Sequence, residues 1–194
     1  MSEGNSERNE ITLDSLKPDV IDRILDREPE KARQLLEMYA TGAVPEMSLE
    51  AWICGLLFCV KYFLKKFRKL RRKVLKPTPT IVLMDLGIVS KTDELNLFTK
   101  RQVICLDDVE HDAFLRMISQ LHTLARKFPS CAQKLIAIIN SLNQAIVGQC
   151  IKTYSIDVLV NYMSTIYVVI RSIIEESRLE RYTRKATYTE GEEP

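Results

Sequence analysis

Acidic residues are absent from positions 51–84, although the chain as a whole carries 28 Lys and Arg against 26 Asp and Glu. This absence argues against an ordinary surface helix, in which charges of both signs mix and limit repulsion, although a well-charged surface helix stays open as the alternative. Nine cations lie within positions 61–76 of the same stretch, and without them the remaining net charge is −7. The sequence is thus an acidic body with one cationic segment, which predicts a polyanionic partner: nucleic acid or an anionic membrane surface.

A secretory signal, a myristoylation site and an even number of cysteines are also lacking. The chain does not open with a charged segment, an apolar segment and a cleavage site, and Ser2 stands where myristoylation needs glycine. The chain has five cysteines, an odd number. We therefore expect free thiols in a reducing intracellular compartment, the cytoplasm or the nucleus, with peripheral membrane association allowed. Cys54 and Cys59, five residues apart in an apolar segment, are expected to be buried thiols.

Catalytic and metal-binding motifs are missing as well. The sequence has no C-x-x-C, no glycine-rich phosphate loop, no H-E-x-x-H and no G-x-S-x-G, and His111 and His122 are not spaced to complete a zinc site. Asp85 before Gly87 and the acidic cluster at 107–112 are weak candidates for a metal or phosphate site, and a turn and a capped helix start are the favoured explanations. The sequence predicts no enzymatic activity, no catalytic residue, no cofactor and no metal ion.

The cationic segment has the pattern of an amphipathic helix. At 100° per residue, eight of the nine cations share an arc of about 160°, and six apolar residues share an opposite arc of about 120°. Arg71 alone falls on the apolar side, and Tyr62 lies in the basic arc, where it could stack on a base or lie among headgroups. The predicted polyanion-binding residues are Lys61, Tyr62, Lys65, Lys66, Arg68, Lys69, Arg72, Lys73 and Lys76.

The same helix is expected to begin well before its cations. Ser48 is a suitable N-cap, Glu50 suits the first turn, and Pro77 and Pro79 end the helix. Positions 51–60 are apolar on every side of the helix, so they should be buried all round. The helix is therefore expected to join a root inside the core to a cationic, solvated tip.

The remaining patterns predict a mainly α fold, a bundle of about six helices in one domain over 11–181, with disordered tails at 1–10 and 182–194. Helix starts are expected at Pro18, Pro29, Asp107, Pro129 and Ser155, and helix ends near Gly42, Gly148 and Glu180. Short apolar runs at 81–84 and 102–106 allow a β-hairpin near 80–106, with helix as the alternative.

The last helix has an unusually apolar segment. Positions 156–174 carry only two charges, Asp157 and Arg171, and are almost long enough to span a bilayer. Polar residues interrupt the segment, which favours a central core helix. A membrane-spanning segment and an oligomerisation or interfacial helix stay open as alternatives.

These observations favour a non-enzymatic intracellular structural or adaptor protein that docks its basic helix on a polyanion. Viral matrix and accessory proteins have such a design, in which a helical core self-associates and joins an anionic membrane to ribonucleoprotein; the likeness is one of design, not of residues. The alternative is a regulatory protein that binds RNA or DNA, with positions 65–73 as a nuclear import signal. A third class is an adaptor whose basic helix meets an acidic protein surface.

Overall fold

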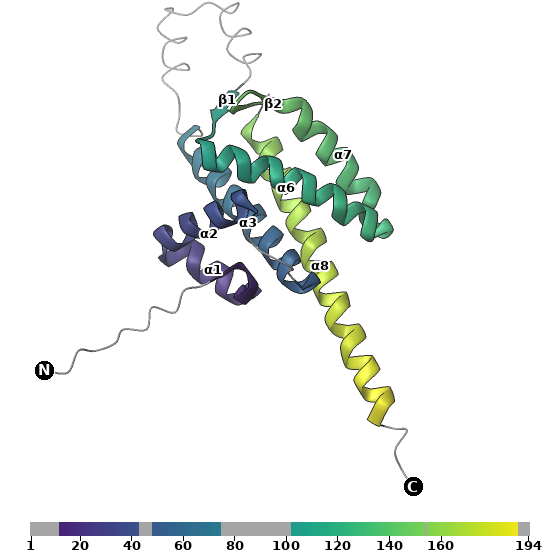
Figure 1. The fold of residues 1–194 in the computed structure, drawn as a ribbon. Coiled ribbons are helices and arrows are strands. Elements are labelled where there is room, and N and C mark those ends of the chain that lie inside the picture. Colours follow the sequence, from purple (N-terminus) through teal and green to yellow (C-terminus); the bar gives the residue numbers. More distant parts are fainter. Residues whose placement is uncertain (1–11, 43–47, 75–101, 154, 190–194) are drawn as a thin grey trace, which may run out of the picture.

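The computed structural model describes residues 12–42, 48–74, 102–153 and 155–189. These residues form a short 3-10 turn, six α-helices and a small antiparallel sheet, which confirms the predicted mainly α fold (Figure 1). The helices are α1 Pro18–Arg27, α2 Pro29–Thr41, α3 Leu49–Val74, α6 Asp108–Lys127, α7 Pro129–Ala145 and α8 Ile156–Thr189, and the strands are β1 Gln102–Cys105, β2 Ile146–Val147 and β3 Cys150–Thr153.

Local chemistry sets several of the helix boundaries at the expected residues. Pro18, Pro29 and Pro129 each occupy a first helical position, where the missing N–H breaks no hydrogen bond. Gly42 ends α2 with a φ of 66°, in the left-handed region that favours glycine. Asp107 and Glu110 form a reciprocal capping box at the start of α6.

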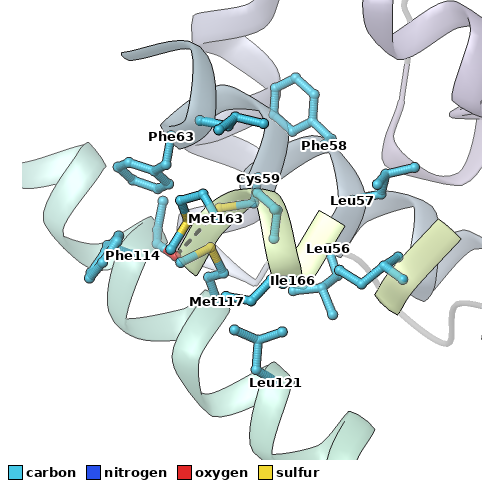
Figure 2. Packing of buried hydrophobic residues seen from close by; sticks show 14 of the residues in the cluster. Leu56, Leu57, Phe58, Cys59, Phe63, Phe114, Met117, Leu121, Met163 and Ile166 are labelled. Carbon is cyan, nitrogen blue, oxygen red and sulfur yellow. Dashed lines mark hydrogen bonds between the residues drawn. The ribbon is translucent and has the colours of Figure 1, made fainter. Parts of the chain in front are cut away.

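The hydrophobic core lies between α3, α6 and α8. α3 packs against α8, α6 and the two N-terminal helices, while α6 lies between α2 and α7 (Figure 1). Figure 2 shows the centre of this core, where Phe63 of α3 meets Phe114 of α6 edge to face, with ring centroids 4.9 Å apart. Met117 of α6 and Met163 of α8 are also fully buried there.

Burial of positions 51–60 of α3 is confirmed except at one residue. Trp52 is partly exposed, and every other residue of the segment is buried. Cys54 and Cys59 are free buried thiols, as predicted, and burial raises the pKa of both. The start of α3 is also confirmed, because the Ser48 hydroxyl accepts a hydrogen bond of 3.2 Å from the Ala51 amide.

One face of α8 belongs to the core and the opposite face does not. Among the described helices, the segment Ile156–Arg178 is the one long and apolar enough to cross a membrane, a test that core helices of soluble proteins also pass. Its buried face includes Met163 and Ile166, whereas Val158 and Val168 are 37% and 59% exposed. The helix runs to Thr189, past its expected end and into the expected C-terminal tail.

The small sheet confirms a strand in the run 102–106 and adds a hairpin outside the expected range. β1 lies in the predicted apolar run 102–106, but its partner is β3, which joins β2 in a hairpin that the sequence did not suggest. Gly148, with a φ of 58°, turns that hairpin instead of ending α7, which stops at Ala145. The run 81–84, the N-terminal tail 1–10 and Pro77 lie outside the described residues.

Replacing Phe58 with alanine is expected to lower the free energy of unfolding by about 3–5 kcal/mol, because its fully buried ring would leave a cavity. Trp52→Ala should cost less, about 2 kcal/mol, because Trp52 keeps part of its surface in water. Denaturant unfolding followed by circular dichroism measures both losses. A loss at Trp52 equal to that at Phe58 would contradict the burial described here.

Candidate polyanion-binding site

The cations of α3 divide into two groups once the fold places them. Four have acidic partners on neighbouring helices and are called the inner cations: Lys61, Lys65, Lys66 and Arg71. Four others are exposed and are called the outer cations: Arg68, Lys69, Arg72 and Lys73. Lys76, also predicted to bind a polyanion, lies outside the described residues.

Two inner cations hold α1 against α3. Asp22 and Asp26 are four residues apart on α1, and they form ion pairs with Lys61 and Lys65, which are four residues apart on α3. The hydrogen bond from Lys65, 2.9 Å long, is the main reason why the pKa of Asp26 is lowered. The Lys61 side chain is only 12% exposed, and its ammonium also lies over the ring of Tyr167, 5.1 Å from the centroid. These cations are largely compensated within the fold.

Glu110 on α6 is the partner of two further side chains of α3. Its carboxylate is buried, and it accepts hydrogen bonds from Lys66 Nζ at 2.6 Å and from the Tyr62 hydroxyl at 3.0 Å. Burial and the nearby Glu110 charge raise the pKa of Tyr62 to about 12. The capping contact with the Asp107 amide uses the other carboxylate oxygen, at 3.2 Å. Lys66 and Tyr62 therefore hold α3 to α6, and the Tyr62 hydroxyl is engaged inside the fold.

Arg71 completes the inner group. Its guanidinium lies 3.4 Å from the Asp157 carboxylate at the start of α8. Its Nε is buried and has no hydrogen-bond partner among the described residues. The sequence placed Arg71 on the apolar side of α3, and the contact with α8 agrees with that position.

The outer cations are exposed, and within the described part of the chain they have neither an ion pair nor a hydrogen bond from their side chains. They form two pairs with i,i+4 spacing, Arg68 with Arg72 and Lys69 with Lys73, so like charges lie one turn apart and repel. The negative end of the helix dipole offsets part of this repulsion. The result is a compact cationic end on a helix whose root is fixed in the core.

A groove of about 640 Å³ runs beside this end of α3. Its lining comes from α1 and α3: Asp22, Leu25, Asp26, Lys61, Leu64, Lys65, Arg68, Lys69 and Arg72. The acidic residues of α1 are engaged with the inner cations, whereas Arg68, Lys69 and Arg72 line the groove without such partners. An anion entering the groove would meet these three side chains.

Sequence reasoning missed the acidic partners. Asp22, Asp26, Glu110 and Asp157 are distant from α3 in sequence, and only the fold brings them to it. A partial signal existed on α1, where two aspartates with i,i+4 spacing lie opposite the apolar stripe, matching the lysine spacing on α3.

The acidic cluster at 107–112 serves the start of α6. Asp107 accepts two hydrogen bonds from Arg33, at 2.8 and 3.0 Å, and Asp108 accepts one from Gln149. In the described ranges, no group of three His, Cys, Asp or Glu side chains is placed to hold a metal ion. Asp85 and Gly87 lie outside those ranges.

Comparisons with protein-family models, curated proteins and solved structures gave no match to this chain.

Replacing Lys66 with methionine is expected to lower the free energy of unfolding by about 3 kcal/mol, because it leaves the Glu110 carboxylate buried without its cation. The matched control is Lys69→Met on the exposed side of the same helix, which should change stability by no more than about 0.5 kcal/mol. Urea unfolding at neutral pH measures both. Equal effects would show that the inner and outer cations do not differ as described.

The pairing of Asp107 with Arg33 predicts a pH-dependent contribution to stability. The Arg33 hydrogen bonds are the main cause of the lowered Asp107 pKa, so the folded state holds this proton less tightly than the unfolded chain, where the pKa is about 3.9. The contribution is therefore present above about pH 4 and is lost as the pH falls through the folded-state value. Asp107→Asn keeps a capping side chain, and should cost up to about 1 kcal/mol at pH 7 and less below pH 4. Urea unfolding across this range would contradict the assignment if the cost did not vary.

Proposed function

We propose that this chain is a non-enzymatic structural or adaptor protein that docks the tip of α3 on an anionic membrane surface. The observation that carries the proposal is the exposure of Arg68, Lys69, Arg72 and Lys73 without acidic partners among the described residues. Elsewhere on α3 the fold supplies an acidic partner for each described cation. A surface that keeps four like charges close together bears a repulsion that a polyanion would relieve.

Charge, not insertion, is the proposed mode of contact. Phe63 and Phe67 are 0% exposed and pack on Phe114, so they cannot enter a bilayer while α3 stays in the fold. Each Lys or Arg near an anionic membrane contributes about 1 kcal/mol, so the outer cations would contribute about 4 kcal/mol together. Such binding is reversible and weakens as salt is added.

The wider proposal is a matrix-type role, in which the same protein associates with ribonucleoprotein and with copies of itself. The basic tip offers one surface to lipid and RNA, so the two should compete. The exposed face of α8, with Val158 and Val168, supports self-association, because apolar side chains there have no partner in the described part of the monomer.

The test is co-sedimentation with vesicles. Wild-type protein is expected to sediment with vesicles of phosphatidylcholine and phosphatidylserine at about 50 mM salt, but not with phosphatidylcholine alone, because only the first carries negative charge. Reversing Arg68, Lys69, Arg72 and Lys73 to Glu should abolish sedimentation and leave the helical circular-dichroism spectrum unchanged.

The matched control reverses four exposed cations elsewhere, Arg126, Lys127, Lys134 and Lys152, and changes the net charge by the same amount. This variant is expected to keep a substantial part of the binding. Equal loss in both variants would mean that net charge, not the tip of α3, drives association, and would overturn the proposed site.

Binding to single-stranded RNA tests the alternative function, nucleic-acid binding. Four phosphate contacts predict a log–log salt slope of about −3 for single strands. The protein would be a nucleic-acid-binding protein instead if it binds RNA with that slope and does not bind vesicles. Reversal of the outer cations should then abolish RNA binding. Binding to neither polyanion would leave the tip as a surface for an acidic protein.

A further inference from the structure

Two cysteines face each other across the small sheet. In the antiparallel pairing of β1 with β3, Cys105 is directly opposite Cys150. Cys105 is exposed and Cys150 is half-buried, whereas the neighbouring pair, Ile104 and Ile151, faces the core. Because side chains alternate between the faces of a strand, both thiols lie on the solvent face of the sheet.

The hydrogen-bond pattern places this pair where the two strands are closest. The Leu106 amide donates to the Gln149 carbonyl at 3.0 Å, so these two opposed residues form a hydrogen-bonded pair. Hydrogen-bonded and non-hydrogen-bonded pairs alternate along an antiparallel ladder. Cys105 and Cys150, the next pair along, are therefore a non-hydrogen-bonded pair. In that kind of pair the Cα atoms are about 4.5 Å apart, within the range that disulfides accept.

Two neighbours of Cys150 shift its pKa in opposite directions. A hydrogen bond with the Cys105 side chain is the main cause that raises the pKa of Cys150. Lys152 lies two residues beyond Cys150 on the same face, and its charge acts in the opposite direction. Neither Cys105 nor Cys150 belongs to the hydrophobic core. The remaining three cysteines have no such partner, since Cys54 and Cys59 are buried and Cys131 is on α7.

We propose that Cys105 and Cys150 are a redox-active dithiol that closes reversibly to a cross-strand disulfide by exchange with a low-molecular-weight disulfide. In the first step a thiolate of the pair attacks one sulfur of the small disulfide, forms a mixed disulfide and releases one small thiol. In the second step the other cysteine loses its proton, attacks the mixed disulfide and releases the second small thiol. The two cysteines are oxidised by two electrons, the small disulfide is reduced to two thiols, and no other reactant is needed.

Closure would add a covalent bond between two strands that lead into different helices. β1 leads directly into the Asp107 cap of α6, and β3 leads into α8. A bond between them closes the chain through α6 and α7 into a covalent loop, which restricts the unfolded chain and stabilises the fold. A disulfide exposed on a surface sheet is also accessible to reducing thiols, as a reversible device requires.

The experiment treats the native full-length protein with oxidised glutathione and follows it by intact mass and peptide mapping. Wild type is expected to lose two of its five thiols, to hold no glutathione and to yield a peptide that joins Cys105 to Cys150. The melting temperature should rise by about 5 °C or more, and dithiothreitol should reverse both changes.

Single variants identify the pair. Cys150→Ser should leave Cys105 with a stable glutathione adduct, because the resolving thiol is gone, whereas Cys131→Ser should behave as wild type. Far-UV circular dichroism establishes that the variants are folded. Phenylarsine oxide, which binds two adjacent thiols, is a second probe, and it should be retained by wild type and by Cys131→Ser but not by Cys105→Ser.

Stable glutathione adducts on wild-type Cys105 or Cys150 would overturn the proposal. A disulfide that maps to another pair, or that joins two chains, would overturn it equally.

Discussion

The burial of positions 51–60 of α3, complete except at Trp52, is the constraint on which the rest of the structure depends. A helix with no polar face must be surrounded, and α1, α2, α6 and α8 supply the surfaces that surround it. Those same neighbours bring Asp22, Asp26 and Glu110 to the point where the cations of α3 begin. The core thus determines which cations are compensated and which remain exposed.

Much of the fold could be predicted because its signals are local. Proline at helix starts, Gly42 at a helix end and the capping box of α6 act within a few residues, and the structure confirms them. The β2–β3 hairpin was missed because its strands are only two and four residues long, too short for a pattern to emerge. The length of α8 was underestimated because its end lacks apolar periodicity.

The sequence could predict where the candidate site lies on α3, but not which of its cations have acidic partners. A sequence shows that Lys61 and Lys69 are both cations on one helix, but it does not show that Lys61 meets an aspartate and a tyrosine ring from two other helices. Pairing between distant segments depends on tertiary packing, and a helical wheel contains no such information. The same limit applies to Cys105 and Cys150, whose opposition depends on strand register.

α3 continues without a break from its buried root to its exposed tip, over a length of about 39 Å. The arrangement of the outer cations therefore exists only while the core is formed, so binding of the proposed polyanion would be thermodynamically linked to folding. A polyanion that prefers this arrangement to the same charges on an unfolded chain will raise the stability of the whole domain. By the same linkage, a cavity in the core far from the tip would weaken the proposed docking if the protein then spends an appreciable fraction of its time unfolded.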